Sequence, residues 1–465
     1  MTNVQQEVDD WPNIAVRLGA ESSFGAHRVR IGKTNSRIYA AEEFRPVLVL
    51  GPQRSYKTSG FAIPTVLEWE GPVVTTSVRH DILDDTYEWR KRVGKISIFD
   101  PSNSLKDTIY AEHCYNWNLL GHCRTWDDSV RMGKALTEAG RAGGSQGAGS
   151  GLLDADFWYS MAGKLIVPHL FAASMNGYTM DDVVRWIKTQ EEFEVRSLLQ
   201  ATGHEGSIRS AEAAWQREDR ARSSIYTTAE QILQVFDYED NNIFSEPFLN
   251  LSEFFDSDSD TIYIVAPPDE QEEYKPLFTG LVRTIIREAY RRNSQVEDKR
   301  QQIFSMPDAR DPNQEHEQSR REIVPLLLML DEAGNIAPLA TLDTLATTAA
   351  GTCVQMVSIF HDISQIQALY GIYKAQSIVS NHSAFIVLPG ARDVTTLTYV
   401  ESLLRGERVA NSVEYKWGGP RPIRSMKRGE ALLIYENLRP IVLRLRSKFS
   451  DDALSARVNC TKVIL

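Results

Sequence analysis

One short run of residues limits the possible folds of this chain more than any other feature. Residues 51–58 read Gly-Pro-Gln-Arg-Ser-Tyr-Lys-Thr and match the phosphate-binding pattern G-x-x-x-x-G-K-[ST] at every fixed position except Tyr56, where the pattern has glycine. Such a loop places backbone N–H groups, a lysine ammonium and a helix N-terminus around the β- and γ-phosphates of a nucleotide. The candidate nucleotide-binding residues are Gly51, Pro52, Gln53, Arg54, Ser55, Tyr56, Lys57 and Thr58.

The sequence around this loop supplies the context that the loop needs. Residues 45–50 are a short β-prone run, and a helical pattern begins at Thr58. The sequence therefore predicts a strand, a phosphate-binding turn and a helix, in that order. A glycine-poor surface turn is the alternative interpretation, and the loop by itself does not decide between them.

A second motif is an apolar run over residues 323–330 that ends in two carboxylates, Asp331 and Glu332. Ligands of α/β proteins bind at the carboxyl ends of strands. Beside a phosphate-binding loop, we expect Asp331 and the hydroxyl of Thr58 to hold Mg²⁺, and Glu332 to orient and deprotonate the attacking water. An acidic pair that caps a helix is the alternative. Because both motifs have their required context, the chain is expected to bind a nucleotide with Mg²⁺.

Short apolar runs alternate with helical patterns through much of the chain, which predicts an α/β fold with a mostly parallel central sheet flanked by helices. The expected strands are 73–77, 96–99, 261–265, 326–330, 355–360 and 384–388, followed by a hairpin of 431–435 and 440–446 at the sheet edge. Residues 112–250 instead show helical periodicity and predict an inserted all-α domain. The Gly/Ser-rich run 140–151 is expected to be a loop, and the polar stretch 295–322 a solvated excursion.

Composition limits the partners and the compartment. The chain has 465 residues, four cysteines without C-x-x-C spacing, and a net charge of −11. The cysteines favour a reducing compartment over a disulfide framework. Because the averaged charge repels nucleic acid, any DNA contact requires a local basic surface or a pore. Arg90-Lys91-Arg92 and the group Arg287, Arg291 and Arg292 are candidates, with solvated helix faces as the alternative.

Several segments together resemble the TraG/TraD-type coupling ATPases of type IV secretion and conjugation, which are relatives of the FtsK and HerA DNA motors. These segments are spread over nearly the whole chain: residues 51–58 and 60–65, Ile98-Phe99-Asp100-Pro101, Phe157-Trp158, Leu330-Asp331-Glu332 and residues 364–371. The stretch 116–123 is most similar to actinobacterial members of the family.

The resemblance implies a RecA-like P-loop NTPase with an inserted all-α domain. By this comparison, residues 1–45 are a β-rich extension, 46–111 with 251–465 the nucleotide-binding domain, and 112–250 the insert that recognises a relaxase, other cargo or DNA. It further implies a homo-hexameric ring that hydrolyses ATP and delivers DNA or a protein–DNA substrate to membrane channel proteins.

Members of the family usually begin with transmembrane helices, so this chain resembles the anchor-less subgroup. We therefore expect a cytoplasmic protein at the inner face of the plasma membrane, with a membrane-anchored paralogue as a further potential partner.

Three departures from the family pattern fall on functional positions. Tyr56 replaces glycine, His361 replaces a glutamine that senses the γ-phosphate, and Thr352 replaces an arginine near the subunit interface. His361 is nevertheless a candidate catalytic residue, with Glu332 and Lys57, because a neutral imidazole donates one hydrogen bond. Arg405 or Arg408 could supply the missing charge. The alternatives are a working ATPase and a degenerate scaffold that binds nucleotide weakly or not at all and recruits cargo or an active paralogue.

Overall fold

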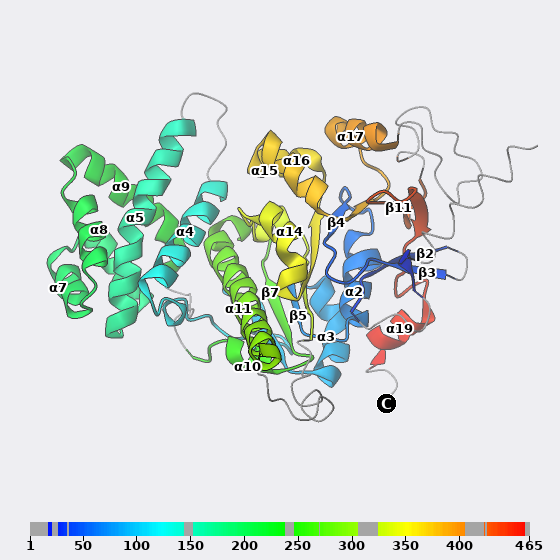
Figure 1. The fold of residues 1–465 in the computed structure, drawn as a ribbon, viewed down its shortest axis with the longest axis horizontal. Coiled ribbons are helices and arrows are strands. Elements are labelled where there is room, and N and C mark those ends of the chain that lie inside the picture. The colour runs from blue at the N-terminus through cyan, green and yellow to red at the C-terminus, as the bar shows by residue number, and fades with distance from the viewer. Residues whose placement is uncertain are drawn as a thin grey trace, which may run out of the picture.

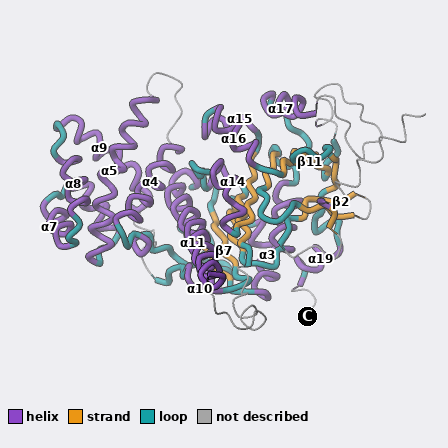
Figure 2. Tube along the Cα trace, in the orientation of Figure 1, coloured by secondary structure: helices purple, strands orange, loops and turns teal. Residues whose placement is uncertain are grey.

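The computed structural model describes residues 17–20, 27–34, 37–143, 152–237, 246–268, 270–305, 324–404, 423 and 426–460. The strands within these ranges form one twelve-stranded sheet (Figures 1 and 2). In chain order they are β1 (Gly19–Ala20), β2 (Arg30–Thr34), β3 (Arg37–Ala40), β4 (Val47–Leu50), β5 (Val73–Ser77), β6 (Ile96–Phe99), β7 (Thr261–Val265), β8 (Leu326–Leu330), β9 (Val354–Phe360), β10 (Ala384–Val387), β11 (Glu430–Tyr435) and β12 (Ile441–Arg444).

The larger part of the sheet is parallel. Its spatial order is β1-β3-β2-β12-β11-β10-β4-β9-β8-β5-β7-β6, and every pair from β10 to β6 is parallel. Successive residues of β4 enter opposite apolar clusters, Leu48 and Leu50 on one face and Val47 and Val49 on the other. Burial on both faces explains why these strands are continuous apolar runs. The predicted α/β fold is confirmed.

Helices cover both faces of the sheet. The face of Val47 is covered by α2 (Ile63–Glu68), α3 (Asp81–Val93) and α19 (Asp452–Val458). The face of Leu48 is covered by α11 (Gln271–Ser305), α13 (Ala333–Ile336), α14 (Leu342–Thr352), α15 (Ile363–Tyr370), α16 (Ile372–Asn381) and α17 (Val394–Leu404).

A group of helices lies to one side of the sheet, at the left in Figure 1. It comprises α4 (Trp126–Gly143), α5 (Leu152–Asn176), α6 (Met180–Thr189), α7 (Phe193–Ala201), α8 (Glu205–Trp215) and α9 (Asp219–Leu233), with the short α10 (Leu251–Asp256) nearer the sheet. Because β6 and β7 are parallel neighbours, the chain between them must cross back, and these helices lie within that crossover. The predicted helical stretches are confirmed, whereas 112–250 as a separate domain stays a prediction.

The structure corrects one sequence prediction and leaves another open. The β11–β12 hairpin is not at the sheet edge, because β2 pairs with β12 and is followed by β3 and β1. Residues 295–305 belong to α11, so this part of the expected solvated excursion is helical, while 306–322 lie outside the described residues. Of the Gly/Ser-rich run, residues 144–151 also lie outside the described residues. No helix in the described ranges is both long and apolar enough to cross a bilayer.

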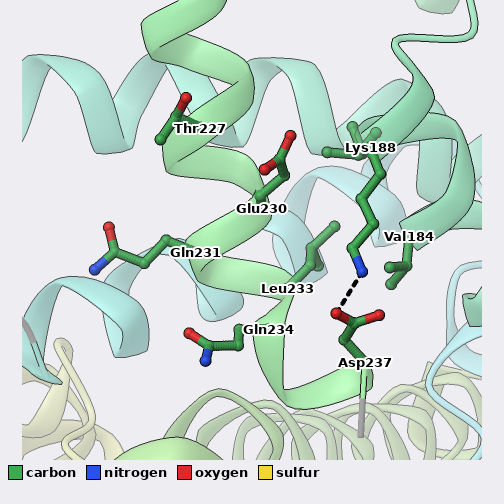
Figure 3. A pocket seen from close by; sticks show the side chains of 9 residues that line it. Val184, Lys188, Thr227, Glu230, Gln231, Leu233, Gln234 and Asp237 are labelled. Atoms are coloured by element: carbon green, nitrogen blue, oxygen red, sulfur yellow. Dashed lines mark hydrogen bonds and ion pairs between the residues drawn. The ribbon is translucent and has the colours of Figure 1, made fainter. Parts of the chain in front are cut away.

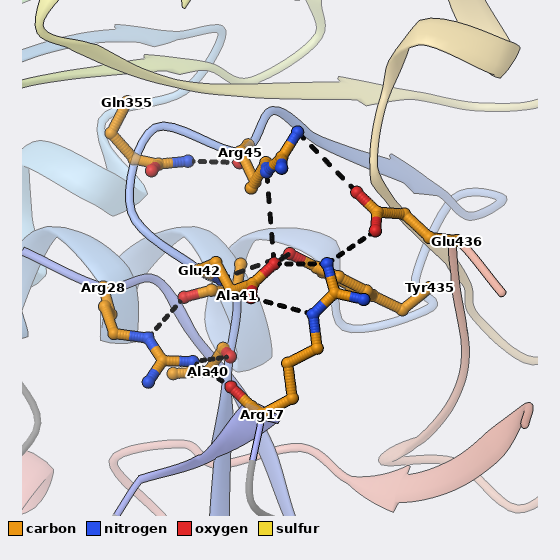
Figure 4. A network of polar contacts seen from close by, with 9 residues as sticks. All are labelled: Arg17, Arg28, Ala40, Ala41, Glu42, Arg45, Gln355, Tyr435 and Glu436. Atoms are coloured by element: carbon orange, nitrogen blue, oxygen red, sulfur yellow. Dashed lines mark hydrogen bonds and ion pairs between the residues drawn. The ribbon is translucent and has the colours of Figure 1, made fainter. Parts of the chain in front are cut away.

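A polar network ties the N-terminal segment to the hairpin (Figure 4). Arg17 donates to Glu42 Oε1 at 2.8 Å and to Glu436 Oε2 at 2.6 Å, and the Tyr435 hydroxyl donates to Glu42 Oε2 at 2.9 Å. The Arg17 contact is the main reason that the pKa of Glu42 lies below its usual value. These contacts fix Arg17 and Glu42 against the end of β11 and the turn that follows it.

Candidate nucleotide-binding site

Three neighbouring strands deliver the predicted site residues to one edge of the sheet. The loop 51–58 follows β4, His361 follows β9, and Asp331 and Glu332 follow β8. Since β4, β9 and β8 are adjacent and parallel, their carboxyl ends meet at this edge. The fold thus brings together side chains that are about three hundred positions apart in sequence, such as Lys57 and His361 with a separation of 304.

The loop has the conformation of a tight turn at the start of a helix. Arg54 and Tyr56 have positive φ values of 62° and 74°. Ser55 and Lys57 are buried, Pro52 is half-buried, and Gln53 and Arg54 are exposed. A Cβ atom at Gly51 would lie 2.4 Å from Ser55 Oγ and 2.9 Å from Leu388 Cδ1, so a larger residue would displace both side chains. Thr58 begins a π-helical turn (Thr58–Ala62) that continues into α2, so the predicted helix is present but starts irregularly.

Tyr56 occupies a backbone conformation that favours glycine, at a cost of roughly 1–2 kcal/mol for a residue with a Cβ. Its Cβ lies beside Gly60 of the π-helical turn: a Cβ atom at Gly60 would lie 3.2 Å from both Tyr56 Cβ and Leu445 Cδ1, and Leu445 directly follows β12. The Tyr56 ring packs partly buried against the apolar cluster on this face, and Arg428 covers it. Gly60 therefore makes room for the unusual residue.

Lys57, Glu332 and His361 form a closed triangle. Lys57 Nζ lies 3.1 Å from Glu332 Oε1 and 2.6 Å from His361 Nδ1, and His361 Nε2 lies 3.0 Å from Glu332 Oε2. A lysine ammonium only donates, so Nδ1 must accept, and the proton on Nε2 is donated to Glu332. Burial raises the pKa of Glu332, but the His361 and Lys57 contacts outweigh it, and the pKa lies below its ordinary value.

A second layer of amides holds this triangle in place. Asn335 Nδ2 donates to Glu332 Oε2 at 3.3 Å, and Gln365 Nε2 donates to Asn335 Oδ1 at 3.2 Å. Gln365 Oε1 accepts from the backbone N–H of His361 at 2.8 Å. Sequence analysis missed both amides. Asn335 could have been found from its position three residues after Glu332, because residues at this spacing in a helix are neighbours on its surface.

Asp331 and Thr58 form the oxygen-rich side of the site. Thr58 Oγ1 donates to Asp331 Oδ2 at 3.0 Å, while the buried Asp331 Oδ1 has no hydrogen-bond partner in the described part of the chain. An orphaned carboxylate oxygen next to a threonine hydroxyl suits Mg²⁺, which prefers oxygen ligands and keeps several waters and phosphate oxygens. Burial, followed by the neighbouring Glu332, raises the pKa of Asp331 to about 7.

This raised pKa gives a prediction for stability. Above pH 7 the folded protein must hold Asp331 ionised and buried, whereas the unfolded carboxyl loses its proton near pH 4. Asp331→Asn is therefore expected to raise the free energy of unfolding at pH 8 by on the order of 2 kcal/mol. The gain should fade as the pH falls from 7 to 4, because the folded wild type then binds the proton. Urea unfolding without Mg²⁺ or nucleotide measures it, and a destabilised variant at pH 8 would contradict the prediction; the exposed Asp258→Asn is the control.

The remaining candidate residues have other placements. Thr352 is buried at the end of α14, and Arg405 and Arg408 lie outside the described residues. Arg90 is fully buried and neither faces solvent nor can line a pore, which corrects both interpretations of that residue. Arg287 and Arg291 line a surface groove.

This groove, of about 870 Å³, runs between α4 and α11. Arginines outnumber acids in its lining: Arg124, Arg131, Arg283, Arg287 and Arg291 face Asp128 and Glu288. Asp128 is shared by Arg131 at 3.5 Å and Arg287 at 2.5 Å, so its charge does not neutralise both. Arg283 is paired with Glu138, which is not among the lining residues, and Arg291 with Glu288, so the groove is basic by a small excess of positive charge.

A smaller cavity of about 300 Å³ lies between α6 and α9 (Figure 3). Lys188 forms an ion pair with Asp237 at one side, and Val184 and Leu233 supply apolar lining. The cavity lies among the helices beside the sheet and does not include residues of the triangle.

Comparison with known proteins identifies the family. The model of a family described as "Type IV secretory system Conjugative DNA transfer" matches residues 13–408. The chain belongs to this family. Among curated proteins it is similar to the conjugal transfer protein TraG of Escherichia coli, with 24% identity over 362 residues that cover 72% of this chain and 51% of TraG. It is also similar to the protein VirD4 of Rhizobium radiobacter, with 24% identity over 409 residues, covering 84% of this chain and 53% of VirD4.

The fold is also similar to that of a solved structure. The plasmid coupling protein TrwB in complex with ADP and Mg²⁺ superposes with a TM-score of 0.62 at 19% identity, covering 87% of this chain and 86% of that chain. The chain spans about half the length of the curated relatives it matches.

Proposed function

We propose that this chain is an ATPase that drives the transfer of DNA, or of a protein–DNA complex, into a type IV secretion channel. The observation that carries this proposal is the arrangement at the sheet edge: Lys57 lies 3.1 Å from Glu332, and Thr58 lies 3.0 Å from Asp331. The nucleotide in the TrwB complex supports ATP and Mg²⁺ as cofactors. Ring assembly, membrane channel partners and a place at the inner membrane face are part of the proposal.

In this function, binding of ATP exchanges contacts within the triangle. The Lys57 ammonium leaves Glu332 and His361 and contacts phosphate oxygens, as a phosphate-loop lysine does. Glu332 is then free to orient a water and accept its proton. His361 donates its Nε2 proton toward the γ-phosphate in place of the family's glutamine. Mg²⁺, held by Thr58 and Asp331, would neutralise phosphate charge.

A degenerate scaffold is the second candidate function. It is favoured by the strained Tyr56 backbone and by the absence of an arginine at Thr352. The two functions separate in a measurement of phosphate release from Mg²⁺-ATP by the purified chain, with Lys57→Ala as the negative control. Turnover that depends on Lys57 supports the ATPase. Turnover that appears only after Tyr56→Gly with His361→Gln supports the scaffold.

The basic groove is the part of the surface best suited to a DNA strand. Single-stranded DNA binds through its phosphates to positively charged grooves, and the binding weakens as salt rises. Arg131 and Arg291 are about half exposed, with side-chain exposures of 51% and 52%. We propose that the cargo strand contacts the groove through these residues, while the helices around the α6–α9 cavity recruit a relaxase-type protein.

Removing two groove charges should weaken DNA binding. Arg131→Gln with Arg291→Gln is expected to lower the affinity for a labelled single-stranded oligonucleotide about tenfold near 0.1 M salt, and to make the log–log salt slope shallower by about 1.4. Fluorescence anisotropy measures both. The matched control is Arg217→Gln with Arg220→Gln, two exposed arginines outside the groove. Equal losses in both double variants would contradict a specific role for the groove.

A further inference from the structure

An arginine from a distant part of the sequence lies on the phosphate loop. The guanidinium carbon of Arg428 is 4.5 Å from the centroid of the Tyr56 ring. Arg428 is exposed, and it has no ion pair within the described ranges. An exposed guanidinium that rests on an aromatic ring keeps its N–H donors available for another ligand.

The sheet topology explains how Arg428 reaches the loop. Val387 of β10 pairs with Leu50 of parallel β4 and with Leu432 of antiparallel β11. Because β11 runs in the opposite direction, its first residue, Glu430, lies at the edge where β4 ends and the loop begins. Arg428 comes two residues before that start. It therefore belongs to the same edge as Lys57 and Glu332.

The turn that carries Arg428 is fixed by hydrogen bonds. Gly429 has a φ of +88°, and its carbonyl accepts from the backbone N–H of Leu445 at 2.7 Å. The backbone N–H of Lys427 donates to Glu430 Oε2 at 2.7 Å. A glycine is required at the positive φ, and the two bonds hold the residue before it against the loop.

We infer that Arg428 is a nucleotide-binding residue that brings a positive charge to the polyphosphate from within the same subunit, and that the Tyr56 ring positions it. The inference rests on the proposed nucleotide site. An arginine can bind phosphate oxygens through two N–H groups and adds charge beside Lys57. This role of Arg428 would also explain why Tyr56 stands where the family has glycine, because glycine has no ring on which an arginine can pack.

Nucleotide affinity tests this inference without depending on turnover. The full-length chain is titrated into fluorescently labelled ATP with Mg²⁺. Arg428→Ala is expected to weaken binding about tenfold, the loss of a hydrogen bond to a charged group. Tyr56→Leu, which lacks a ring face, should weaken it about threefold, whereas Tyr56→Phe should stay within about twofold of wild type. The double variant Arg428→Ala with Tyr56→Leu should bind no more weakly than Arg428→Ala alone.

The neighbouring Lys427→Ala is the matched control, because it removes an exposed cation one residue away that has no contact with the Tyr56 ring. Equal weakening by Lys427→Ala and Arg428→Ala would overturn the inference, and so would wild-type affinity in Arg428→Ala. A wild-type chain that does not bind labelled ATP would overturn both the inference and the proposed function. Binding that needs Arg428, without phosphate release, would support the inference and reject only the ATPase.

Discussion

Glu332→Gln is expected to lower the rate of ATP hydrolysis by about 10²–10³-fold and at the same time to tighten nucleotide binding. The amide cannot accept the proton of the attacking water, so the chemical step loses its base. Glu332 also lies 3.1 Å from the Lys57 ammonium and would therefore compete with phosphate for it. The variant removes that competitor, and a gain of about threefold in affinity corresponds to a weakened ion pair.

Two measurements on the same preparation check this result: phosphate release under saturating Mg²⁺-ATP, and titration with labelled ATP. Glu253→Gln is the control, since Glu253 forms an exposed ion pair with Lys95 away from the site. A Glu332→Gln variant with wild-type turnover would exclude Glu332 as the base. A loss of both turnover and binding would indicate instead that Glu332 is needed to build the loop.

Arg90→Ala is expected to cost about 3–5 kcal/mol of unfolding free energy, the largest stability effect that we predict. Arg90 is fully buried, and burial lowers its pKa to about 10. Its guanidinium donates to the carbonyls of Trp69 at 2.7 Å, Gly71 at 2.9 Å and Ser259 at 2.7 Å, and to Thr261 Oγ1 at 2.7 Å. Truncation leaves these acceptors buried without a donor, which adds to the lost packing.

Arg90→Lys should recover only part of this loss, because an ammonium cannot reproduce the planar set of donors that the guanidinium offers. Urea unfolding of the two variants measures the difference. Lys91→Ala changes the next residue, whose side chain is 44% exposed, and should stay within about 1 kcal/mol of wild type. A similar small effect for Arg90→Ala would mean that water replaces the guanidinium in this part of the core.

Much of the candidate site could be predicted because its motifs are local. The loop 51–58 and the pair Asp331 and Glu332 each carry their chemistry in consecutive residues. The order of β4, β9 and β8 could not be predicted, since strand order depends on long-range packing. It is this order that places His361 on Lys57, and the antiparallel return of β11 that places Arg428 on Tyr56.

Arg90 shows a different limit. As part of a basic triplet it suggested a charged surface, but in α3 it lies on the same face as the buried Ile82, Leu83 and Tyr87. Helical spacing could have revealed this, because residues three, four, seven and eight positions apart share a face. The position of the hairpin inside the sheet was harder to predict from the sequence, because β2 and β3 are short and carry many polar residues.

Helix α11 contacts both the helices beside the basic groove and the helices beside the sheet-edge site. It packs on α4 at the border of the basic groove, and on α13 and α14 at the other side. Helix α13 begins directly after Glu332, the residue that we expect to face the reacting water. Only α13 therefore separates α11 from Glu332. In the function proposed above, α11 would therefore couple nucleotide binding at the sheet edge to strand binding in the groove. Because coupling between two binding sites is reciprocal, any change that nucleotide makes in the affinity of the groove for a strand would be matched by an equal change that the strand makes in the affinity for nucleotide.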